Sequence, residues 1–368
     1  MIHDNIQEAI NHFRFEGRYV DGEEMNAGNI NNSYHLIFRD QDGRRFQYTL
    51  QHINHYVFKN PRGVMNNISL VTEHLRRSLE REGEDVRRHV LVIVPTRQGD
   101  ALYEDNQGGF WRAFEFVDQA TAYDAVEKPE HFYEAGRAFG EFQRRLCDFP
   151  AERLYDTIPD FHNTPKRYQV FEQAVQADRV GRAAQVREEI EFFHARKPMM
   201  SGIVERLDSG EIPLRVTHND TKINNVLIDD ATDRAICVID LDTVMPGSSL
   251  YDFGDAIRYG ASTAAEDEAD LNKIALDMDR FKDFTRGFLS ETNGILSRKE
   301  LELLPLGVKV ITCELAMRFL TDYLDGDRYF KVNSDQHNLI RTRAQMRLLM
   351  DVESKEEEMR RFIGALMD

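Results

Sequence analysis

Residues 214–247 read LRVTHNDTKINNVLIDDATDRAICVIDLDTVMPG, and this stretch carries two motifs joined by a predicted hairpin. The first motif has the form H-x-D-x-x-x-x-N, covers His218 to Asn225 and follows a strand-like stretch at 213–217. The hairpin strands are predicted over 225–228 and 235–241, with a polar turn between them. The second motif, Ile239-Asp240-Leu241-Asp242, ends the second strand. Because both motifs adjoin strand ends, we expect their oxygen-bearing side chains to face one cleft.

The side chains of these motifs suit phosphoryl transfer to an alcohol. That reaction needs a carboxylate beside the attacking hydroxyl and oxygen ligands for a metal ion on the triphosphate. Asp220 can supply the carboxylate, whereas Asn225 and Asp240 can supply oxygens to Mg²⁺, which prefers hard oxygen ligands. Asp242 is either a second metal ligand or a support for the first. The motifs have the order and hairpin spacing of the protein-kinase catalytic loop and its metal-binding aspartate.

Other polar residues near the motifs have structural as well as chemical interpretations. Lys222 could neutralise charge on the transferred phosphoryl group, although a solvated lysine fits the sequence equally well. His218 is interpreted as a residue that orients the loop. The sequence Asp252-Phe253-Gly254-Asp255 opens a predicted helix, so Asp252 or Asp255 is expected to cap that helix or brace the loop.

The pattern before residue 117 predicts a mostly antiparallel sheet and one long helix. Ile6, Ala9, Ile10 and Phe13 first recur at helical spacing near the N-terminus. The long helix is expected at 62–81, with apolar residues along one face. The expected strands are 18–25, 31–38, 44–53, 90–94, 101–104 and 110–117.

From about Pro129 the pattern changes to helices. Apolar residues from Phe132 to Leu146 step by three and four, which is typical of an amphipathic helix, and the chain from Asp252 onward is also predicted to be helical. We therefore predict an α+β, protein-kinase-like bilobal fold. Its β-rich N-terminal, nucleotide-binding lobe would cover 1–117, and its mostly helical catalytic and substrate-binding lobe would cover 118–368.

The composition indicates a folded protein with an acidic surface. Of the 368 residues 41% are hydrophobic, enough for a sizeable core, and the formal net charge is −17. Such a surface repels phosphate backbones and anionic membranes, so we expect neither nucleic acid nor a membrane as a partner. Cys147, Cys237 and Cys313 are predicted to be buried, reduced thiols. With no signal-like N-terminal segment, the sequence favours a cytoplasmic location and leaves the oligomeric state open.

The motifs resemble those of the aminoglycoside phosphotransferase and choline kinase superfamily, whose signature is H-x-D-x-x-x-x-N followed by a strand-borne aspartate. Within that superfamily the sequence is most similar to the bacterial N-acetylhexosamine 1-kinases. The similarity extends over nearly the whole chain. It is carried by LRVTHNDTKINNVL (214–227), IDLDTVMPG (239–247), DFGDAIR (252–258), Met317-Arg318-Phe319-Leu320 and Tyr329-Phe330.

The resemblance implies an ATP- and Mg²⁺-dependent sugar kinase. Its expected reaction is phosphorylation of the anomeric (C1) hydroxyl of an N-acetylhexosamine, which gives the sugar 1-phosphate and ADP. Asp220 would match the catalytic residue that contacts the sugar hydroxyl, and Asn225 and Asp240 would match the metal ligands. Arg318 and Tyr329 fall where those enzymes contact the sugar, and an arginine donor with a tyrosine ring suits a polyol.

The resemblance also places the nucleotide. Backbone groups of Glu115 and Val117, at the end of the last N-terminal strand, would form the adenine hinge. The loop containing Gly28 and Asn29 would approach the phosphates, where a glycine allows a tight turn. Gln51 stands where many kinases carry a phosphate-binding Lys or Arg, and the N-acetylhexosamine kinases resemble this sequence there.

Two alternatives stay open at the level of sequence. The chain could be a kinase of another small alcohol, such as an aminoglycoside, choline or a different sugar. It could also be a pseudokinase that binds nucleotide without turnover, for which Gln51 is the sole support. The sequence does not choose between GlcNAc and GalNAc, nor does it decide whether hexoses without the acetyl group are accepted.

Overall fold

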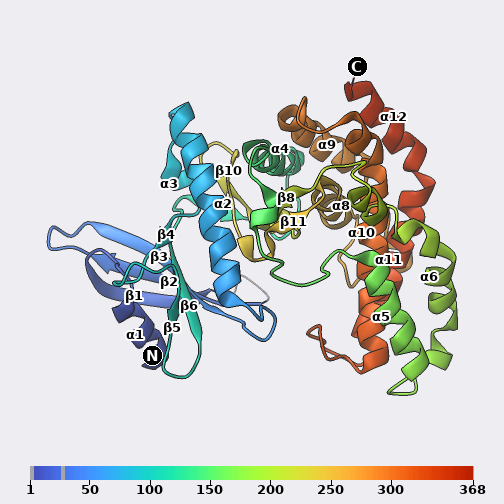
Figure 1. Ribbon diagram of the computed structural model, residues 1–368, viewed down its shortest axis with the longest axis horizontal. Helices are drawn as coiled ribbons and strands as arrows, with labels where there is room; N and C mark the ends of the chain where they lie inside the picture. The colour runs from blue at the N-terminus through green and yellow to red at the C-terminus, as the bar shows by residue number, and fades with distance from the viewer. Residues whose placement is uncertain (1–3, 26–29, 368) are drawn as a thin grey trace. The chain divides into compact units, whose positions relative to one another are not determined.

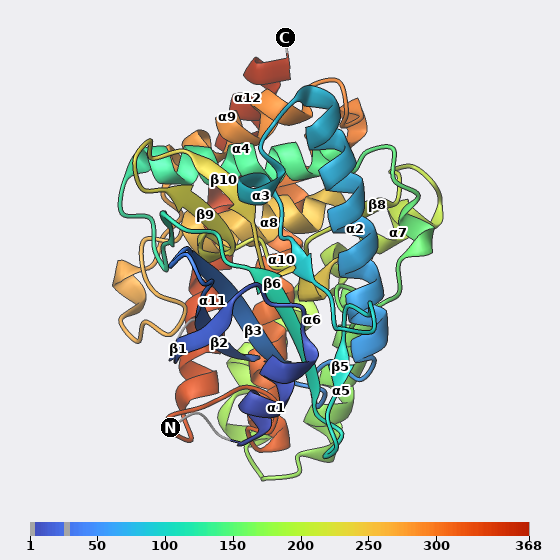
Figure 2. The same ribbon diagram turned by 90° about the vertical axis from the view of Figure 1, so that its left-hand side faces the viewer.

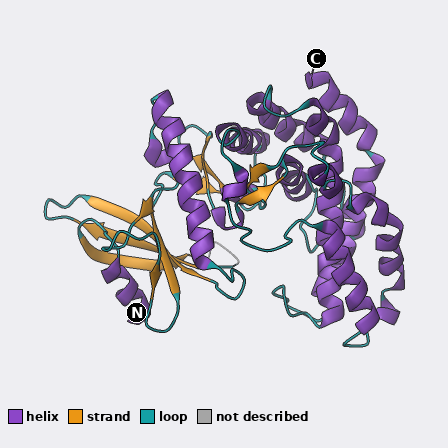
Figure 3. Cartoon of the chain, in the orientation of Figure 1, coloured by secondary structure: helices purple, strands orange, loops and turns teal. Residues whose placement is uncertain are grey.

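The computed structural model describes residues 4–25 and 30–367, which divide into two compact units (Figure 1). The sheet unit consists of Met1–Thr121, Glu152–Pro159 and Leu227–Met245, and the helical unit of Ala122–Ala151, Asp160–Val226 and Pro246–Asp368. Figure 3 shows strands concentrated in the first and helices in the second. The predicted α+β class is therefore confirmed. The functional boundary at residue 117 stays a prediction.

The sheet unit is built on an antiparallel sheet. Its order is β1-β2-β3-β6-β4, and β5 pairs with β6. The strands are β1 (Arg18–Met25), β2 (Asn32–Arg39), β3 (Arg45–Ile53), β4 (Ile93–Val94), β5 (Tyr103–Glu104) and β6 (Phe110–Glu115). The register sets Gln51 on β3 directly opposite Arg112 on β6. These strands confirm the predicted meander except at 90–94, where Val90 ends the short helix α3 (Val86–His89) and pairing begins only at Ile93.

Two helices in this unit follow the predicted periodicity. In α1 (Asp4–His12) the apolar residues Ile6, Ala9 and Ile10 are buried against the sheet, as Figure 2 shows for the helix. The longer α2 (Pro61–Glu82) starts at Asn60, whose side chain accepts from the Gly63 N–H, and ends at a left-handed Gly83. An amide cap and a C-terminal glycine satisfy backbone groups that the helix cannot pair internally.

The predicted hairpin forms β9 (Val226–Asp229) and β10 (Ala235–Val238), and β7 (Ala120–Ala122) pairs with β9. The second hairpin strand is shorter than the predicted 235–241. It stops at Val238 because Asp240 takes a left-handed backbone conformation, φ 59°, and a 3₁₀ turn, η4 (Leu241–Thr243), follows. The end of the strand was therefore predicted three residues too late, and Asp240 lies on a turn.

The helical unit surrounds one long, buried helix, α10 (Arg298–Asp325). Helices α5, α6, α8, α11 and α12 pack on it. The helices are α4 (Pro129–Arg145), α5 (Thr164–Ala177), α6 (Arg187–Met200), α7 (Val204–Asp208), α8 (Ser249–Gly260), α9 (Met278–Thr292), α10, α11 (His337–Ser354) and α12 (Glu356–Met367). Short 3₁₀ turns are η1 (Ala151–Arg153), η2 (Ala183–Gln185), η3 (Ile223–Asn225) and η5 (Leu271–Lys273). In this unit β8 (Arg215–Thr217) pairs with β11 (Met245–Gly247). None of the helices described at 4–25 and 30–367 is long and apolar enough to cross a membrane.

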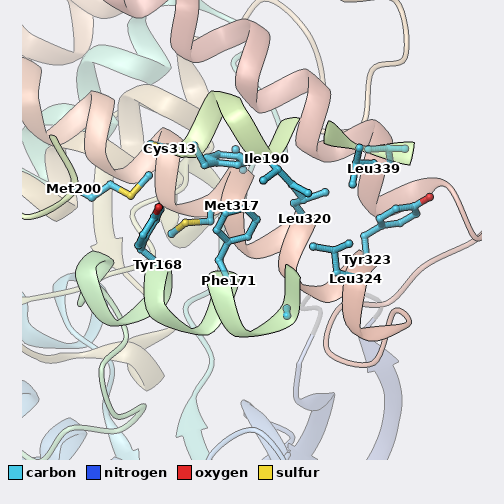
Figure 4. Close-up of a cluster of buried hydrophobic side chains, with 14 of the residues drawn as sticks. Tyr168, Phe171, Ile190, Met200, Cys313, Met317, Leu320, Tyr323, Leu324 and Leu339 are labelled. Carbon is cyan, nitrogen blue, oxygen red and sulfur yellow. The ribbon is translucent and has the colours of Figure 1, made fainter. Parts of the chain in front are cut away.

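Figure 4 shows the hydrophobic cluster that joins α10 to its neighbours. Tyr168 and Phe171 from α5, and Ile190 from α6, pack against Met317 and Leu320 of α10. At roughly 25 cal/mol per Å² of buried apolar surface, such side chains contribute about 1.5–3 kcal/mol each. This cluster fixes the helix that carries Arg318.

The cysteines differ in burial. All three are free thiols, and Cys237 and Cys313 are buried as predicted. Burial raises the pKa of Cys237 to about 12. Cys147 is exposed, so the prediction is wrong for that residue, which follows the end of α4.

Helices α8 and α10 approach each other so closely that only glycine fits between them. A Cβ atom built on Gly254 would lie 2.5 Å from the Gly307 carbonyl oxygen, and one built on Gly307 would lie 2.3 Å from the Leu250 carbonyl oxygen. Both distances are far shorter than a carbon–oxygen contact allows. The contact matters for function because α8 holds the loop described below.

We expect Gly307→Ala to lower the free energy of unfolding by about 1–3 kcal/mol, because α8 and α10 must separate to admit a methyl group. Gly364→Ala is the matched control: it is also helical, and a Cβ there meets no atom within 4 Å. That control should be stabilised by up to about 1 kcal/mol, the helix-propensity gain. Urea unfolding of both variants measures the difference, and equal stabilities would contradict the close contact.

Candidate active site

The residues predicted to form the site are divided between the two units. Asp220, Lys222, Asn225, Arg318 and Tyr329 belong to the helical unit. The sheet unit contains the remaining described candidates: Gln51, Glu115, Val117, Asp240 and Asp242. Gly28 and Asn29 lie outside the described residues. Each group is considered within its own unit.

The loop after β8 is held by one buried carboxylate, that of Asp252 on α8. Its oxygens accept hydrogen bonds from the backbone N–H groups of His218 (3.0 Å) and Asn219 (2.8 Å), and from the Gln143 side chain (2.7 Å). A buried charge is costly unless it is hydrogen-bonded, and here the loop backbone supplies the donors. Asp252 therefore braces the loop, which is one of the two roles predicted for it.

Asp255, one helical turn further along α8, makes a second brace. It accepts from the backbone N–H of Thr221 at 3.1 Å and pairs with Arg258 at 2.8 Å. The other predicted role, capping α8, is wrong for both aspartates, because Ser248 is the cap residue and its hydroxyl accepts from the Leu250 N–H. The aspartates face the loop instead.

His218 is packed in the interior beside aromatic rings. Its ring is fully buried and lies edge-on to Phe139 and Phe142 of α4, with centroids 5.5 and 5.9 Å away. The ring nitrogen Nδ1 accepts from the Asp220 backbone N–H at 3.3 Å. These contacts hold the His218 ring against the backbone of Asp220 and so orient the loop, as predicted for His218.

Asp220, Lys222 and Asn225 converge within this loop. The ammonium Nζ of Lys222 lies 2.9 Å from Asp220 Oδ1. The Asn225 amide nitrogen donates to Asp220 Oδ2 (3.1 Å) and to the Asp220 backbone carbonyl (2.7 Å). With its nitrogen committed to Asp220, the Asn225 amide turns its oxygen the other way, which suits a metal ligand.

The charge state of Asp220 follows from these contacts. Burial by itself would raise its pKa, but the positive charge of Lys222, together with His218 and the Asn225 amide, holds the pKa below its usual value. Asp220 in turn raises the pKa of Lys222. Asp220 is therefore ionised near neutral pH, the form that can accept a proton from a hydroxyl group.

In the sheet unit, Asp240 and Asp242 have opposite environments. The side chain of Asp240 is exposed on the turn after β10. Asp242 is buried, and Arg112 engages both of its carboxylate oxygens. Asn31 also donates to Asp242, at 2.5 Å. Direct metal ligation by either aspartate stays a prediction, and of the two Asp240 has the more accessible carboxylate.

The nucleotide candidates of the sheet unit lie on β3, at the end of β6 and just beyond it. Gln51 is already hydrogen-bonded at both ends: its oxygen accepts from Arg112 Nε at 2.9 Å, and its nitrogen donates to Ser33 Oγ at 2.8 Å. Glu115 is the last residue of β6, and its N–H donates to the Val92 carbonyl. Val117 lies two residues further on. Their roles in cofactor binding stay predictions.

The predicted sugar contacts belong to an aromatic cluster in the helical unit. The Arg318 guanidinium lies 5.2–5.7 Å from the ring centroids of Phe161, Tyr329 and Phe330. Within the described residues no hydrogen bond or ion pair engages that guanidinium, so its donors are available to a ligand. Arg318 and Tyr329 thus lie together, and their contact with a sugar stays a prediction.

A buried aspartate also shapes this cluster. Asp322 accepts from the backbone N–H groups of three successive residues, Arg328 (2.8 Å), Tyr329 (2.8 Å) and Phe330 (3.0 Å). The exposed ring of Tyr329 is therefore presented by a fixed backbone.

Sequence reasoning missed three contributors. Arg112 was not singled out, although a charged residue inside the apolar strand Phe110–Glu115 is a recognisable signal of a buried ion pair. Arg167, whose Nε donates to the Phe161 carbonyl at 3.2 Å, and Phe161 itself lie in an unremarkable polar stretch. Only the fold brings those two residues to Arg318.

The donors present are chemically suited to Mg²⁺. Asn225 and Asp240 offer an amide and a carboxylate oxygen, and magnesium commonly uses one or two such groups with water and phosphate oxygens. Across 4–25 and 30–367 no group of three or more His, Cys, Asp or Glu side chains forms a metal cluster.

The fold and the loop geometry define a class, that of protein-kinase-like phosphotransferases. Residues 36–284 match the model of the phosphotransferase enzyme family, about two thirds of the chain, and the chain belongs to that family.

Similar solved structures have the same fold over nearly their whole length. A microcompartment-associated aminopropanol kinase is 15% identical with a TM-score of 0.58, and the match covers 97% of this chain and 98% of that one. An aminoglycoside phosphotransferase from Alicyclobacillus acidocaldarius is 13% identical (TM-score 0.59; 98% and 97% covered). An amicoumacin kinase, solved in complex with AMP-PNP, Ca²⁺ and Ami, is 14% identical (TM-score 0.60; 96% and 94% covered). The predicted protein-kinase-like fold is confirmed.

Replacing Lys222 should move the pH dependence of phosphoryl transfer. In Lys222→Met burial is no longer opposed by the ammonium group, so the pKa of Asp220 rises. Activity needs ionised Asp220 and is lost as pH falls through its pKa, so the acidic limb of the kcat profile should move to higher pH.

Lys273→Met, which removes an exposed pair with Glu268 at 3.3 Å, is the control and should leave the profile in place. A fall in kcat for Lys222→Met without any displacement of the acidic limb would mean that Lys222 does not set the charge state of Asp220.

Proposed function

We propose that this chain transfers the γ-phosphoryl group of ATP, with Mg²⁺, to the C1 hydroxyl of an N-acetylhexosamine such as GlcNAc or GalNAc. The observation that carries the proposal is the loop in which an ionised Asp220 is held between Lys222 and Asn225. Membership of the phosphotransferase enzyme family supports the reaction type. The sequence resemblance to N-acetylhexosamine 1-kinases supports the acceptor.

The proposed reaction is a direct in-line transfer without a phosphoenzyme. The C1 oxygen bonds to the γ-phosphorus while the bond to the β,γ-bridging oxygen breaks, and ADP leaves. Asp220 orients the hydroxyl and accepts its proton late. An anomeric hydroxyl is more acidic than an ordinary alcohol, so a carboxylate of low pKa is an adequate base.

Asn225 and Asp240 would hold the magnesium ion, and Lys222 would face the transferred phosphoryl oxygens. A magnesium ion held there would neutralise charge on the phosphate oxygens. Glu115 and Val117 would contact adenine through backbone groups. The structure that the similar amicoumacin kinase forms with AMP-PNP and Ca²⁺ supports a nucleotide with a divalent cation.

The charge around the proposed acceptor site favours a neutral substrate. Arg318 and Arg167 both contact Phe161, one through its ring and the other through its carbonyl group. Burial, together with the nearby charge of Arg318, lowers the pKa of Arg167 against the opposing charge of Glu314. Two guanidinium groups repel a cation but can donate to hydroxyl and acetamide oxygens. This arrangement supports an N-acetylated sugar.

The main alternative is a cationic alcohol. The similar structures include an aminopropanol kinase and aminoglycoside phosphotransferases, whose named substrates carry amines. Sites for such cations use acidic or aromatic surroundings. Phe161, Tyr329 and Phe330 could provide the aromatic part, but Arg318 occupies the position among them that a cationic ligand would take.

Asp220→Asn should abolish turnover while leaving ATP binding largely intact, because the amide cannot accept the proton. We expect kcat to fall by at least about 10²–10⁴-fold, the usual contribution of general acid–base catalysis. ADP release and calorimetric ATP binding measure the two effects. Near-normal turnover in this variant would remove the role of Asp220, and a wild-type chain that binds ATP without releasing ADP would be a pseudokinase.

A substrate panel tests the acceptor. GlcNAc and GalNAc should be phosphorylated, and their 1-O-methyl glycosides should not, because the reacting hydroxyl is blocked. Glucosamine is the matched control for charge, since it replaces the acetamide with an ammonium group, and it should be a poor substrate like choline and aminoglycosides. Preference for the amines, or activity on the methyl glycosides, would overturn the proposed acceptor or the proposed position of transfer.

A further inference from the structure

A buried charge in the sheet unit, that of Arg112 on β6, is hydrogen-bonded on all three of its nitrogens. Its two terminal nitrogens bind the two carboxylate oxygens of Asp242 in a bidentate pair, and both side chains are only 2% exposed. Its third nitrogen, Nε, donates to Gln51 on β3. The guanidinium also lies 5.4 Å from the Phe114 ring centroid, and one of its nitrogens lies 3.9 Å from the sulfur of Met65 on α2. It is fully committed to protein partners.

Asp242 joins segments that are distant in sequence. Besides Arg112 it accepts from the Asn31 side chain, whose own oxygen accepts from the Asn54 backbone N–H at 2.9 Å. Asn31 directly precedes β2, and Asn54 directly follows β3. The Asp242 carboxylate thus connects the start of β2 and the end of β3 to the turn that carries Asp240.

That turn needs such an anchor. Asp240 has φ 59° without being glycine, a conformation that persists only where its surroundings impose it. The turn is fixed at Asp242 by Arg112, and again at Val244, whose carbonyl accepts from Asn67 of α2 at 2.9 Å. With the Asp242 side chain and the Val244 carbonyl held by these bonds, Asp240 stays exposed.

We propose that Asp242 is an internal anchor and not a metal ligand, and that Arg112, oriented by Gln51, is the positioning residue that aims Asp240 at the magnesium ion of the nucleotide. The inference rests on the proposed function for the presence of that ion. The same arrangement accounts for Gln51. At the position where many kinases carry a cation that binds phosphate, this chain has an amide that orients Arg112 toward the interior.

The test is the gain in ATP affinity that Mg²⁺ provides, measured by titration calorimetry as the ratio of the dissociation constants in EDTA and in excess Mg²⁺, with no acceptor present. Arg112→Lys keeps the charge but loses the bidentate pair and the bond to Gln51. We expect it to reduce the Mg²⁺ gain by about tenfold, which corresponds to about 1.4 kcal/mol. Asp242→Asn should have the same effect, and the double variant should lose no more than either single variant, because both remove one anchor.

The opposite result identifies a direct ligand. If Asp242 binds the metal, Arg112→Lys frees its oxygens and the Mg²⁺ gain stays constant or rises, while Asp242→Asn alone loses it. That pattern would overturn the proposal. A wild-type chain that binds no ATP in Mg²⁺ would instead refute the proposed function and leave the anchor to be judged by stability alone.

Two further variants keep the test decisive. Gln51→Met removes the acceptor for Arg112 Nε, together with the bond to Ser33, and serves if Arg112→Lys does not fold. The anchor predicts a smaller loss confined to Mg²⁺, whereas equal weakening in Mg²⁺ and EDTA would mean that Gln51 binds phosphate directly. Arg196→Lys is the matched control, since Arg196 makes a bidentate pair with Glu353 (2.9 and 2.7 Å) in the helical unit. It should keep the wild-type Mg²⁺ gain.

Discussion

The buried carboxylate of Asp252 is the constraint on which the candidate site depends. Removing a carboxylate from water costs several kcal/mol unless donors replace the lost hydration. Here two successive backbone N–H groups, those of His218 and Asn219, replace it, so the loop must follow the helix that carries Asp252. The helix is in turn set by the glycine contact between α8 and α10. The position of Asp220 therefore follows from helix packing rather than from the conformational preferences of its own loop.

The same solution recurs in both units. Asn219 and Asp240 both have left-handed backbone conformations, φ 65° and 59°, and each lies beside or at a predicted functional carboxylate. Such residues cost about 1–3 kcal/mol, although Asn and Asp tolerate the conformation better than most. In each case a buried aspartate nearby, Asp252 or Asp242, holds the strained segment through charge-assisted hydrogen bonds. Asp252 is thus structural, Asp242 is proposed to be structural, and the acids proposed to act chemically are more exposed.

The division between what could and could not be predicted has a physical origin. Periodicity located α2, α4 and the β1–β3 meander to within about two residues, because their apolar faces are buried locally. It failed at 90–94 and at the end of β10, since a short apolar run does not reveal where pairing stops or where φ changes sign. The motif spacing correctly joined Asp220 to Asn225 within one loop. No local signal could reveal that Arg112 pairs with a residue 130 positions away, because that contact forms only when β6 and the turn η4 come together in the fold.

Acceptor choice is the property that the fold determines least. Kinases with the same fold over nearly their whole length bear names that range from aminopropanol to amicoumacin, at 14–15% identity. The shared fold therefore does not choose the acceptor, and we propose that a few side chains on the helical unit set the charge that an acceptor can carry. In this chain the aromatic rings that could surround an amine already lie around Arg318. The Asp322 carboxylate accepts hydrogen bonds from the backbone that presents Tyr329. With Asp322 committed to that backbone, the Arg318 guanidinium leaves donors in the cluster, and donors suit the neutral, oxygen-rich acceptor that we propose.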